Sequence, residues 1–232
     1  MNKILFDTHL HTSELSPCGM VSYRELPKIF VRAGFGGIIV TDHYSQYSFS
    51  MLPQSNFRAK LDYYFSVYHW LADECEKEGV KIMFGSEIAL NNGLWQDFLI
   101  YGDIEKSFRN TFELYNYTQE ELFYFCLENN LLMFQAHPFR TGITLSDLSY
   151  VHGLEVYNSS INTNGVCSRS LELCLKHDLM QIAGSDFHYG RKPRTAGVYL
   201  PPEAWTANGF VEYYRRNTPE LYVKRENDTY TY

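Results

Sequence analysis

The sequence predicts a single α/β domain in which parallel strands alternate with helices and close into a barrel. Short apolar, β-branched segments alternate along the chain with longer amphipathic ones, which is typical of parallel strands joined by helical crossovers. Roughly seven such units follow one another, and this favours a barrel over an open sheet. No internal repeat, low-complexity tract or linker interrupts the 232 residues. One domain over residues 1–232 is therefore expected.

The first half of the chain carries clear helix signals. Ser22 is a suitable N-cap for a helix from Tyr23 to Ala33, because its hydroxyl can accept a hydrogen bond from the first turn, and Gly34 suits the C-terminal end. A long helix is expected from Phe57 to Glu78, closed by Gly79. The apolar runs predict strands at Lys3–Phe6, Gly37–Thr41, Val80–Phe84 and Asp97–Tyr101, and a Tyr- and Ser-rich loop is expected at Tyr44–Asn56.

The second half repeats the alternation. Thr118 and Glu121 form the pattern of a capping box, in which each side chain accepts a hydrogen bond from the other residue's backbone N–H. The helix that they open is expected to run to about Asn130. Further strands are predicted at Leu131–Gln135, Gly153–Tyr157, Leu179–Ala183, Val198–Leu200 and Leu221–Lys224, and further helices at Val166–His177 and Ala204–Arg216.

Composition restricts the classes of function and location. The formal net charge is −7, so the chain gains nothing from counterion release and no long nucleic acid is expected as a partner. A small anionic substrate remains compatible, because bound cations reverse the local field. No apolar run approaches the ~20 residues that span a bilayer, and the N-terminus has no signal-peptide pattern. The five cysteines form no CxxC pair, which favours a reduced, cytoplasmic protein without membrane association.

Metal-ligating side chains follow the predicted strands at their C-terminal ends. In a parallel barrel these ends meet on a single face, and in extended His-x-His and Asp-x-His pairs both side chains point the same way. Imidazole and carboxylate are the ligands that Zn, Mn and Fe prefer. A shared metal cluster is therefore expected from His9, His11, His43, Glu87, His137, Asp186 and His188. The other histidines, His69, His152 and His177, show no such pattern and are interpreted as structural or surface residues.

The segments that carry these ligands resemble the successive motifs of the PHP (polymerase and histidinol phosphatase) superfamily. In order they are Asp7-Thr8-His9-Leu10-His11, Thr41-Asp42-His43, Gly85-Ser86-Glu87, Ala136-His137-Pro138 and Gly184-Ser185-Asp186-Phe187-His188. The likeness spans nearly the whole chain. It implies a distorted (β/α)7 barrel with its active site at the C-terminal face of the strands, two to three divalent metal ions (Zn, Mn or Fe) and hydrolysis of phosphoesters.

The resemblance also implies how the ligands are shared. The first ion would be held by His9, His11, Glu87 and Asp186. Glu87 would bridge to a second ion, which His137 also binds. His43 and His188 would hold a third.

Further roles follow from the same resemblance. Catalytic proton transfer would fall to Asp186, His188 or His43. Asp7 and Asp42 resemble residues that lie behind the ligands and orient neighbouring imidazoles.

Two positions depart from the PHP pattern. Many relatives place a His or Asp ligand of the third ion about six residues after the second motif histidine, where this chain has Pro17. Glu14 or Cys18 could take that role, and a plain structural turn is equally compatible. Relatives often place a ligand of the second ion just after the fourth strand, where this chain has no histidine. Asp103 or water could complete that site.

Polar residues beyond the motifs are candidates for contact with a substrate. Arg140 and Arg191 follow the last two motifs, where a phosphate-binding guanidinium is expected, although a surface salt bridge is the alternative for each. Glu155 and Asn158 lie at the end of a predicted strand and are expected to support the site or line the cleft.

The expected function is hydrolysis of a phosphate ester of a small molecule by a metal-activated water. Such a phosphomonoesterase would be histidinol-phosphatase-like or nucleotide-directed. One alternative is an exonuclease or nucleotide phosphodiesterase, against which the acidic charge argues. Another is a non-catalytic metal-binding PHP domain, with which the two departures are compatible. A third is a carbon–nitrogen hydrolase of the amidohydrolase type, which commonly bridges its metals with a lysine where this chain has Glu87.

Overall fold

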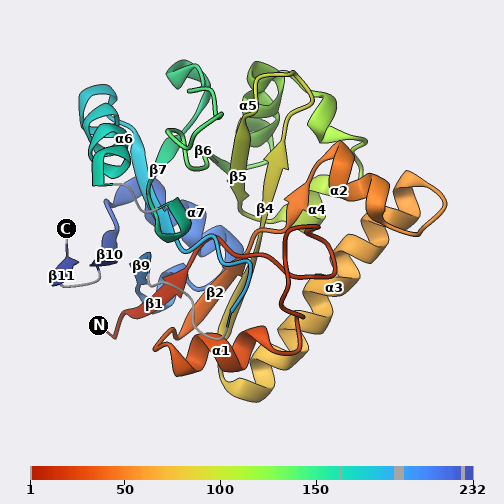
Figure 1. Cartoon of the computed structure of the whole chain (residues 1–232), viewed down its shortest axis with the longest axis horizontal. Helices are drawn as coiled ribbons and strands as arrows, with labels where there is room; N and C mark the ends of the chain where they lie inside the picture. Colours follow the sequence, from red (N-terminus) through yellow and green to blue (C-terminus); the bar gives the residue numbers. More distant parts are fainter. Residues whose placement is uncertain (1, 162–163, 191–195, 226–227, 232) are drawn as a thin grey trace.

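A single curved sheet organises the protein, whose computed structural model describes residues 2–161, 164–190, 196–225 and 228–231 (Figure 1). The strand order is β11-β10-β9-β1-β2-β4-β5-β6-β7-β8, and the short β3 pairs with β4 off this path. The strands are β1 (Ile4–Asp7), β2 (Gly37–Val40), β3 (His43–Tyr44), β4 (Lys81–Ala89), β5 (Asp97–Tyr101), β6 (Leu132–Gln135), β7 (Gly153–Asn158), β8 (Met180–Gly184), β9 (Ala196–Leu200), β10 (Glu220–Arg225) and β11 (Asp228–Thr231).

Strand direction departs from the prediction at β5, and again at β9 and β10, which are antiparallel to their neighbours. The strands β1, β2 and β4 run parallel to one another, as do β6, β7 and β8, whereas β5 is antiparallel to both β4 and β6. The expectation of uniformly parallel strands was therefore wrong for β5. Residues 90–96, which join β4 to β5, are too few for a crossover of a dozen or more residues. They make a hairpin connection that contains Asn92 and Gly93, and Gly93 has a φ of +74°.

The sheet nearly closes into a barrel where the chain leaves β1 and β8. The amide of Asp186 donates to the carbonyl of His9 at 2.7 Å, and the amide of His11 donates to the carbonyl of Phe187 at 3.1 Å. Gly184 permits this approach, since a Cβ there would lie 2.4 Å from the Cβ of His9. These contacts confirm the expected distorted barrel and close it at the strand ends that carry the predicted metal ligands. On the other side of β1, the antiparallel strands β9, β10 and β11 extend the sheet.

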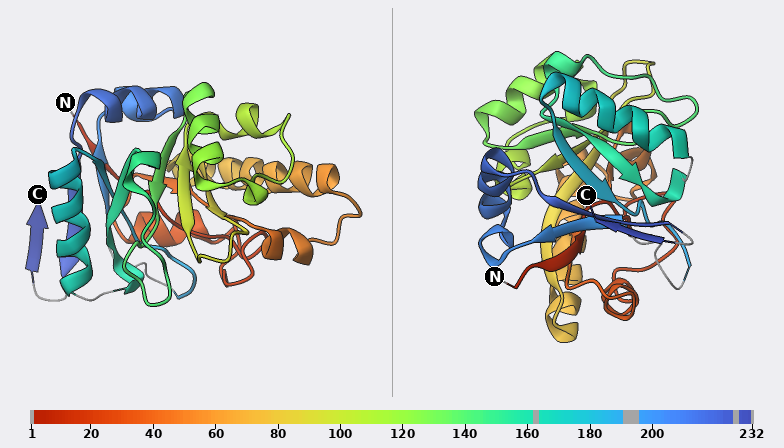
Figure 2. Two further views of the ribbon diagram at one scale, coloured as in Figure 1. Left: turned by 90° about the horizontal axis from the view of Figure 1, so that it is seen from above. Right: turned by 90° about the vertical axis from the view of Figure 1, so that its left-hand side faces the viewer.

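The helices lie around the outside of the curved sheet (Figure 2). No helix among the described residues is long and apolar enough to cross a membrane. The α-helices are α1 (Leu26–Arg32), α2 (Gln46–Met51), α3 (Phe57–Glu78), α4 (Ile104–Phe108), α5 (Gln119–Glu128), α6 (Asn164–His177) and α7 (Ala207–Arg216). Short 3-10 helices are η1 (Leu114–Asn116), η2 (Leu148–Tyr150), η3 (Ser159–Ile161) and η4 (Pro202–Ala204).

Two of the helix ends predicted from capping residues are found in the structure, and a third is not. Helix α3 ends at Gly79, whose φ is +72°, as predicted. The capping box of Thr118 and Glu121 at the start of α5 is also confirmed. Helix α1 instead begins at Leu26, later than predicted, with Pro27 in its first turn. Proline has no N–H to donate and fits best in the first turn of a helix, so the helix cannot begin as early as Tyr23.

The segment expected to be a loop between Tyr44 and Asn56 contains helix α2. Ser45 and Ser48 form a capping box at its start: the Ser45 side chain accepts from the Ser48 amide, and the Ser48 hydroxyl accepts from the Ser45 amide. Serine is a weak helix former but a strong N-cap. The Tyr- and Ser-rich composition therefore hid a short helix next to the candidate site.

Candidate metal centre

Two histidines from the end of β1 meet one carboxylate from β4 and one that follows β8. The Nε2 atom of His9 lies 3.4 Å from both Glu87 Oε1 and Asp186 Oδ1. The Nε2 atom of His11 lies 3.2 Å from Asp186 Oδ1 and 3.4 Å from Glu87 Oε2. All four side chains are buried. The structure thus brings together the four residues predicted to hold the first ion.

Glu155 on β7 fixes the orientation of His9. Its Oε1 lies 2.9 Å from His9 Nδ1, and because an ionised carboxylate only accepts, Nδ1 carries the proton. The other ring nitrogen of His9, Nε2, therefore faces Glu87 and Asp186. The second oxygen of Glu155 accepts from the amide of His137 at 2.8 Å. Glu155 is a support of the site, as expected.

The two aspartates predicted to orient imidazoles act less directly. Asp7 accepts from the backbone amides of His9 (3.1 Å) and Ser185 (3.0 Å), so it holds the strand ends together, and within the described chain it forms no hydrogen bond to an imidazole nitrogen. Asp42 accepts from the Ser16 hydroxyl at 2.8 Å, and Ser16 Oγ lies 3.0 Å from His11 Nδ1. Asp42 thus positions His11 through Ser16.

A second group of potential ligands shares Glu87. The Nε2 atom of His137 lies 3.0 Å from Glu87 Oε1 and 3.8 Å from Asp97 Oδ2. Asp97 was not identified from the sequence, which suggested Asp103 or water to complete this group; the structure places Asp103 elsewhere. Asp103 accepts from the amide of Lys106 at the start of α4. Because β5 is antiparallel, its first residue lies at the site and its C-terminal end points away. The Asn-Gly pair before β5 is a hairpin signal that could have shown this.

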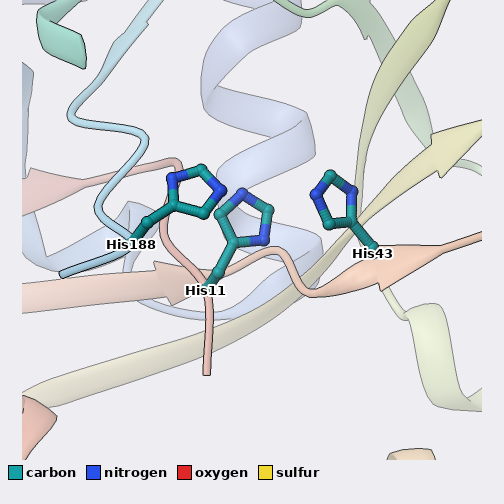
Figure 3. Close-up of side chains that lie close together, drawn as sticks. All are labelled: His11, His43 and His188. Carbon is teal, nitrogen blue, oxygen red and sulfur yellow. The ribbon is translucent and has the colours of Figure 1, made fainter. Parts of the chain in front are cut away.

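A third group consists of stacked imidazoles. The ring of His11 lies between those of His43 and His188, with centroid distances of 4.5 Å and 4.4 Å (Figure 3). Cys18 is in hydrogen-bond contact with both His43 and His188. Glu14 faces elsewhere, because its carboxylate accepts from the Ser22 hydroxyl at 2.7 Å and the Tyr23 amide at 3.2 Å. Glu14 and Cys18 were the two residues suggested to replace the ligand that is missing at Pro17. The structure places Cys18 beside the imidazoles of the third group and turns Glu14 away from them.

Burial and mutual charge set the protonation of the cluster. Burial alone would lower the pKa of His9, but the charges of Asp186, Glu155 and Glu87 outweigh it and raise that pKa well above its usual value. Burial would raise the pKa of Glu87, but His43 and His9 hold it well below its usual range. Burial raises the pKa of Cys18, and hydrogen bonds to His188 and His43 outweigh this and lower it to about 6.

His11 is kept in its neutral form. Burial, together with the charge of His43, lowers the pKa of His11 to about 3. A neutral imidazole is the form that binds a metal.

Two residues of the candidate site adopt the left-handed region of backbone conformation: His137 has a φ of +31° and Asp186 one of +54°. Non-glycine residues rarely adopt such angles, and they cluster at functional sites.

Unsatisfied atoms indicate that the cluster is built for cations. Within the described part of the chain, His9 Nε2 and Glu87 Oε2 are buried without a hydrogen-bond partner. Glu87 Oε2 nevertheless lies 2.8 Å from His43 Nδ1. Buried polar atoms are normally paired, and divalent ions between these nitrogens and oxygens would pair them. The residues therefore fit divalent metals. Among the described residues, four overlapping groups of three have ligand atoms within 4.8 Å of one another: His9, His11 and Glu87; His9, His137 and Asp186; Glu87, Asp97 and His137; His11, His43 and His188.

A cavity of about 640 Å³ opens beside the second and third groups. Its lining includes His43, Cys18 and Asp97, residues of α2, and the exposed Arg140. Arg140 is thus placed where the sequence predicted a phosphate-binding guanidinium. Arg191, the other predicted arginine, lies outside the described residues.

Comparison with known proteins gives likenesses in structure alone. No protein-family model matches the chain, and no curated protein sequence matches it significantly. A two-domain protein from Bacteroides vulgatus containing a predicted PHP-like metal-dependent phosphoesterase is 18% identical, with a TM-score of 0.68 over 96% of this chain. This chain spans 65% of that protein's length.

Two further solved structures are similar. A Bifidobacterium adolescentis protein to which metal-dependent phosphoesterase activity is attributed has a TM-score of 0.56 and 18% identity, over 81% of this chain and 89% of the other. An amidohydrolase from Chromobacterium violaceum, solved with sulfate and without metal, has a TM-score of 0.57 and 13% identity, over 85% of this chain and 92% of the other. The chain therefore has the fold of the PHP-like metal-dependent phosphoesterases, as the order of its sequence motifs indicated.

Proposed function

We propose that the protein is a metal-dependent phosphoesterase that hydrolyses a phosphate monoester of a small molecule. One observation carries this proposal: Glu87 lies within 3.4 Å of four imidazoles, those of His9, His11, His43 and His137. A carboxylate in the middle of so many metal-ligating nitrogens suits a bridge between ions. The fold shared with PHP-like phosphoesterases supports the same reaction class.

The residues around Glu87 would hold two ions, and the third group another. Divalent ions bound there lower the pKa of water toward 7 and offset charge on phosphoryl oxygens. Arg140, at the cavity rim, binds the phosphate in this proposal, because a guanidinium matches phosphate geometry with two parallel hydrogen bonds. Asp186 lies 3.4 Å from His188 Nδ1, which joins the buried imidazoles to a half-buried one and provides a route for a proton.

The cavity favours a small substrate. A space of about 640 Å³ lies within the usual range for small-molecule sites. The net charge of −7 works against long polyanions, which bind proteins chiefly through released counterions. A phosphate ester of metabolite size is the substrate class that the site fits best.

The test compares metal content and phosphate release. Wild-type protein is loaded with Zn, Mn or Fe in turn, analysed for bound metal, and assayed with p-nitrophenyl phosphate, its diester and a panel of natural monoesters. His9→Ala should lose metal and phosphate release together. His69→Ala, which alters a histidine paired with Glu105 away from the cluster, should retain both.

The other outcomes separate the alternatives. Faster cleavage of the diester than of every monoester would replace the proposal with a phosphodiesterase. Stoichiometric metal without turnover of any ester would replace it with a metal-binding domain. A chain that takes up no metal under replete conditions would overturn the metal centre itself.

A further inference from the structure

The loop that carries Cys18 is anchored on both sides to the histidines of the third group. Two residues before Cys18, the Ser16 hydroxyl accepts from the backbone amide of His43 at 3.0 Å. Two residues after it, the amide of Met20 donates to the carbonyl of His188 at 2.7 Å. The chain on either side of Cys18 is therefore tied to the backbones of the two histidines that the thiol contacts.

Close packing behind the loop restricts it further. The amide of Gly19 donates to the carbonyl of Ser16 at 2.8 Å, which makes a tight turn. A Cβ on Gly19 would lie 2.4 Å from the carbonyl oxygen of Thr12, so the turn rests directly on the backbone that follows β1. Cys18 consequently projects from a fixed turn, at the rim of the cavity that His43 also lines.

The imidazole of His188 has a nitrogen free for a ligand bond. Its Nδ1 lies 2.7 Å from the carbonyl oxygen of Asp186. A carbonyl oxygen accepts, so Nδ1 carries a proton, and Nε2 is the nitrogen that remains to bind a metal. A histidine that donates its other N–H to a backbone carbonyl is the usual arrangement of a metal ligand.

We propose that Cys18, His43 and His188 form a thiolate-containing metal site, with its remaining coordination position open toward the cavity. The site takes a thiophilic divalent ion such as Zn²⁺ in preference to Mn²⁺. Three protein ligands and one open position are the arrangement of catalytic zinc sites. A thiolate favours zinc, whereas a site of carboxylates alone is equally suited to manganese. This inference rests on the proposed metal centre and specifies the chemistry of its third group.

Cobalt substitution tests the inference without an activity assay. Metal-free protein is titrated with Co²⁺ under exclusion of air, and its absorption spectrum is recorded together with the number of bound ions. The wild type should show a thiolate-to-cobalt charge-transfer band in the near ultraviolet, beside the weaker visible bands. Cys18→Ser should lose this band and bind one ion fewer. Cys18→Asp, which restores an anionic donor, should recover the ion without the band.

A matched cysteine variant controls for the loss of any thiol. Cys75 is buried in α3, and Cys75→Ala should keep both the band and the metal content. Two or more bound ions without a charge-transfer band in the wild type would overturn the thiolate site and leave the proposed phosphoesterase intact. No bound cobalt at all would overturn both, because the metal centre itself would be absent.

Alkylation provides a second measurement, and its main comparison is made on the wild type alone. Cys18 is exposed, whereas Cys75, Cys126 and Cys174 are buried. Iodoacetamide should therefore label Cys18 in metal-free wild-type protein, as seen by peptide mass spectrometry, and Zn²⁺ should abolish this labelling. In His188→Ala the protection by Zn²⁺ should be lost. Labelling that proceeds equally with and without Zn²⁺ in the wild type would contradict the site.

Discussion

A carboxylate behind a histidine determines which nitrogen the histidine presents. At Glu155, the 2.9 Å contact with His9 Nδ1 leaves the other nitrogen facing Glu87 and Asp186. The same side chain accepts from the amide of His137 and from the side chain of Asn158. Glu155 thus orients the His9 imidazole and holds the backbone of His137. It acts from behind these residues and does not belong to a ligand motif.

Removing the charge of Glu155 should weaken metal binding. Glu155→Gln leaves the size of the side chain unchanged but takes away the anion that makes His9 a better donor. We expect metal affinity to fall about 10- to 100-fold, measured by competition with a chromogenic chelator. Glu128→Gln, on the exposed side of α5, is the matched control. Unchanged affinity in Glu155→Gln would mean that His9 keeps its orientation without the carboxylate.

His152 lies outside the cluster and affects stability through its protonation. Its Nδ1 accepts from the amide of Met133 at 3.1 Å, and its ring lies 5.0 Å from that of Phe123. Burial, together with the charge of Arg215, lowers the pKa of His152 from 6.5 to about 4. The folded protein therefore keeps this imidazole neutral at a pH where the unfolded chain protonates it.

The sign of the resulting pH dependence follows from linkage. Between pH 6.5 and about 4 the unfolded state binds the extra proton, so stability falls as pH falls through this range. The loss from this group is on the order of 3 kcal/mol. His152→Gln keeps an acceptor for Met133 but cannot titrate. Urea unfolding across this range should show the wild type losing stability relative to the variant, and parallel curves would refute the assignment.

At the scale of elements, the reversed strand β5 decides which aspartate reaches the site. Asp97 and Asp103 flank the same strand, but the antiparallel pairing with β4 places Asp97 at the cavity and Asp103 at the start of α4. With parallel strands the two positions would exchange ends. The same substitution, aspartate to asparagine, can therefore be made at Asp97 and at Asp103, and its effects at the two ends of β5 can be compared.

Asp97→Asn should remove one metal ion, and Asp103→Asn should not. The amide lacks the charge that holds a cation beside Glu87 and His137, whereas Asn remains a good N-cap for α4. Elemental analysis after equilibration with excess metal measures the difference. Equal metal contents in the two variants would show that Asp97 is not a ligand, and loss of an ion in Asp103→Asn would contradict the strand direction.

Strand positions and most of the residues that gather at the candidate site could be predicted from the sequence because both depend on local patterns. Apolar runs mark the strands, and polar residues such as His9, just after β1, and Glu87, in the last part of β4, follow these runs along the chain. The direction of β5 depended on the length of its connection to β4, which the strand pattern alone does not reveal. The choice between Glu14 and Cys18 depended on tertiary contacts, the hydrogen bond from Met20 to His188 among them. The late start of α1 followed from Pro27, a local signal that was outweighed by Ser22.

The whole molecule concentrates imidazoles and carboxylates where its sheet closes. Ligands from β1, β4 and the segment after β8 lie within hydrogen-bonding or near-contact distance in the buried interior. Buried charges are costly unless they are paired. Ions bound at this point connect strands from both halves of the barrel and should therefore stabilise the folded state as a whole.

Removal of the metal should lower the thermal stability of the entire domain. An ion present at 100 times its Kd stabilises the fold by about 2.7 kcal/mol, which corresponds to a fall in Tm of roughly 5 to 10 °C when it is removed from a protein of this size. Differential scanning calorimetry with and without chelator measures the shift. In His9→Ala, which lacks a ligand of the first ion, the shift should be smaller, and a wild-type Tm that is insensitive to chelator would contradict strong binding.

The hydrogen bonds that join the segment after β1 to the segment after β8 have a consequence for biosynthesis. His9 leaves the ribosome well before Asp186, whose amide closes the sheet against the His9 carbonyl at 2.7 Å. Contacts so distant in sequence form slowly compared with local ones. The nascent chain must therefore carry His9 and His11 until the whole segment up to Asp186 has been made before this carboxylate partner exists. The complete centre can acquire its metal only after nearly all of the barrel has been synthesised.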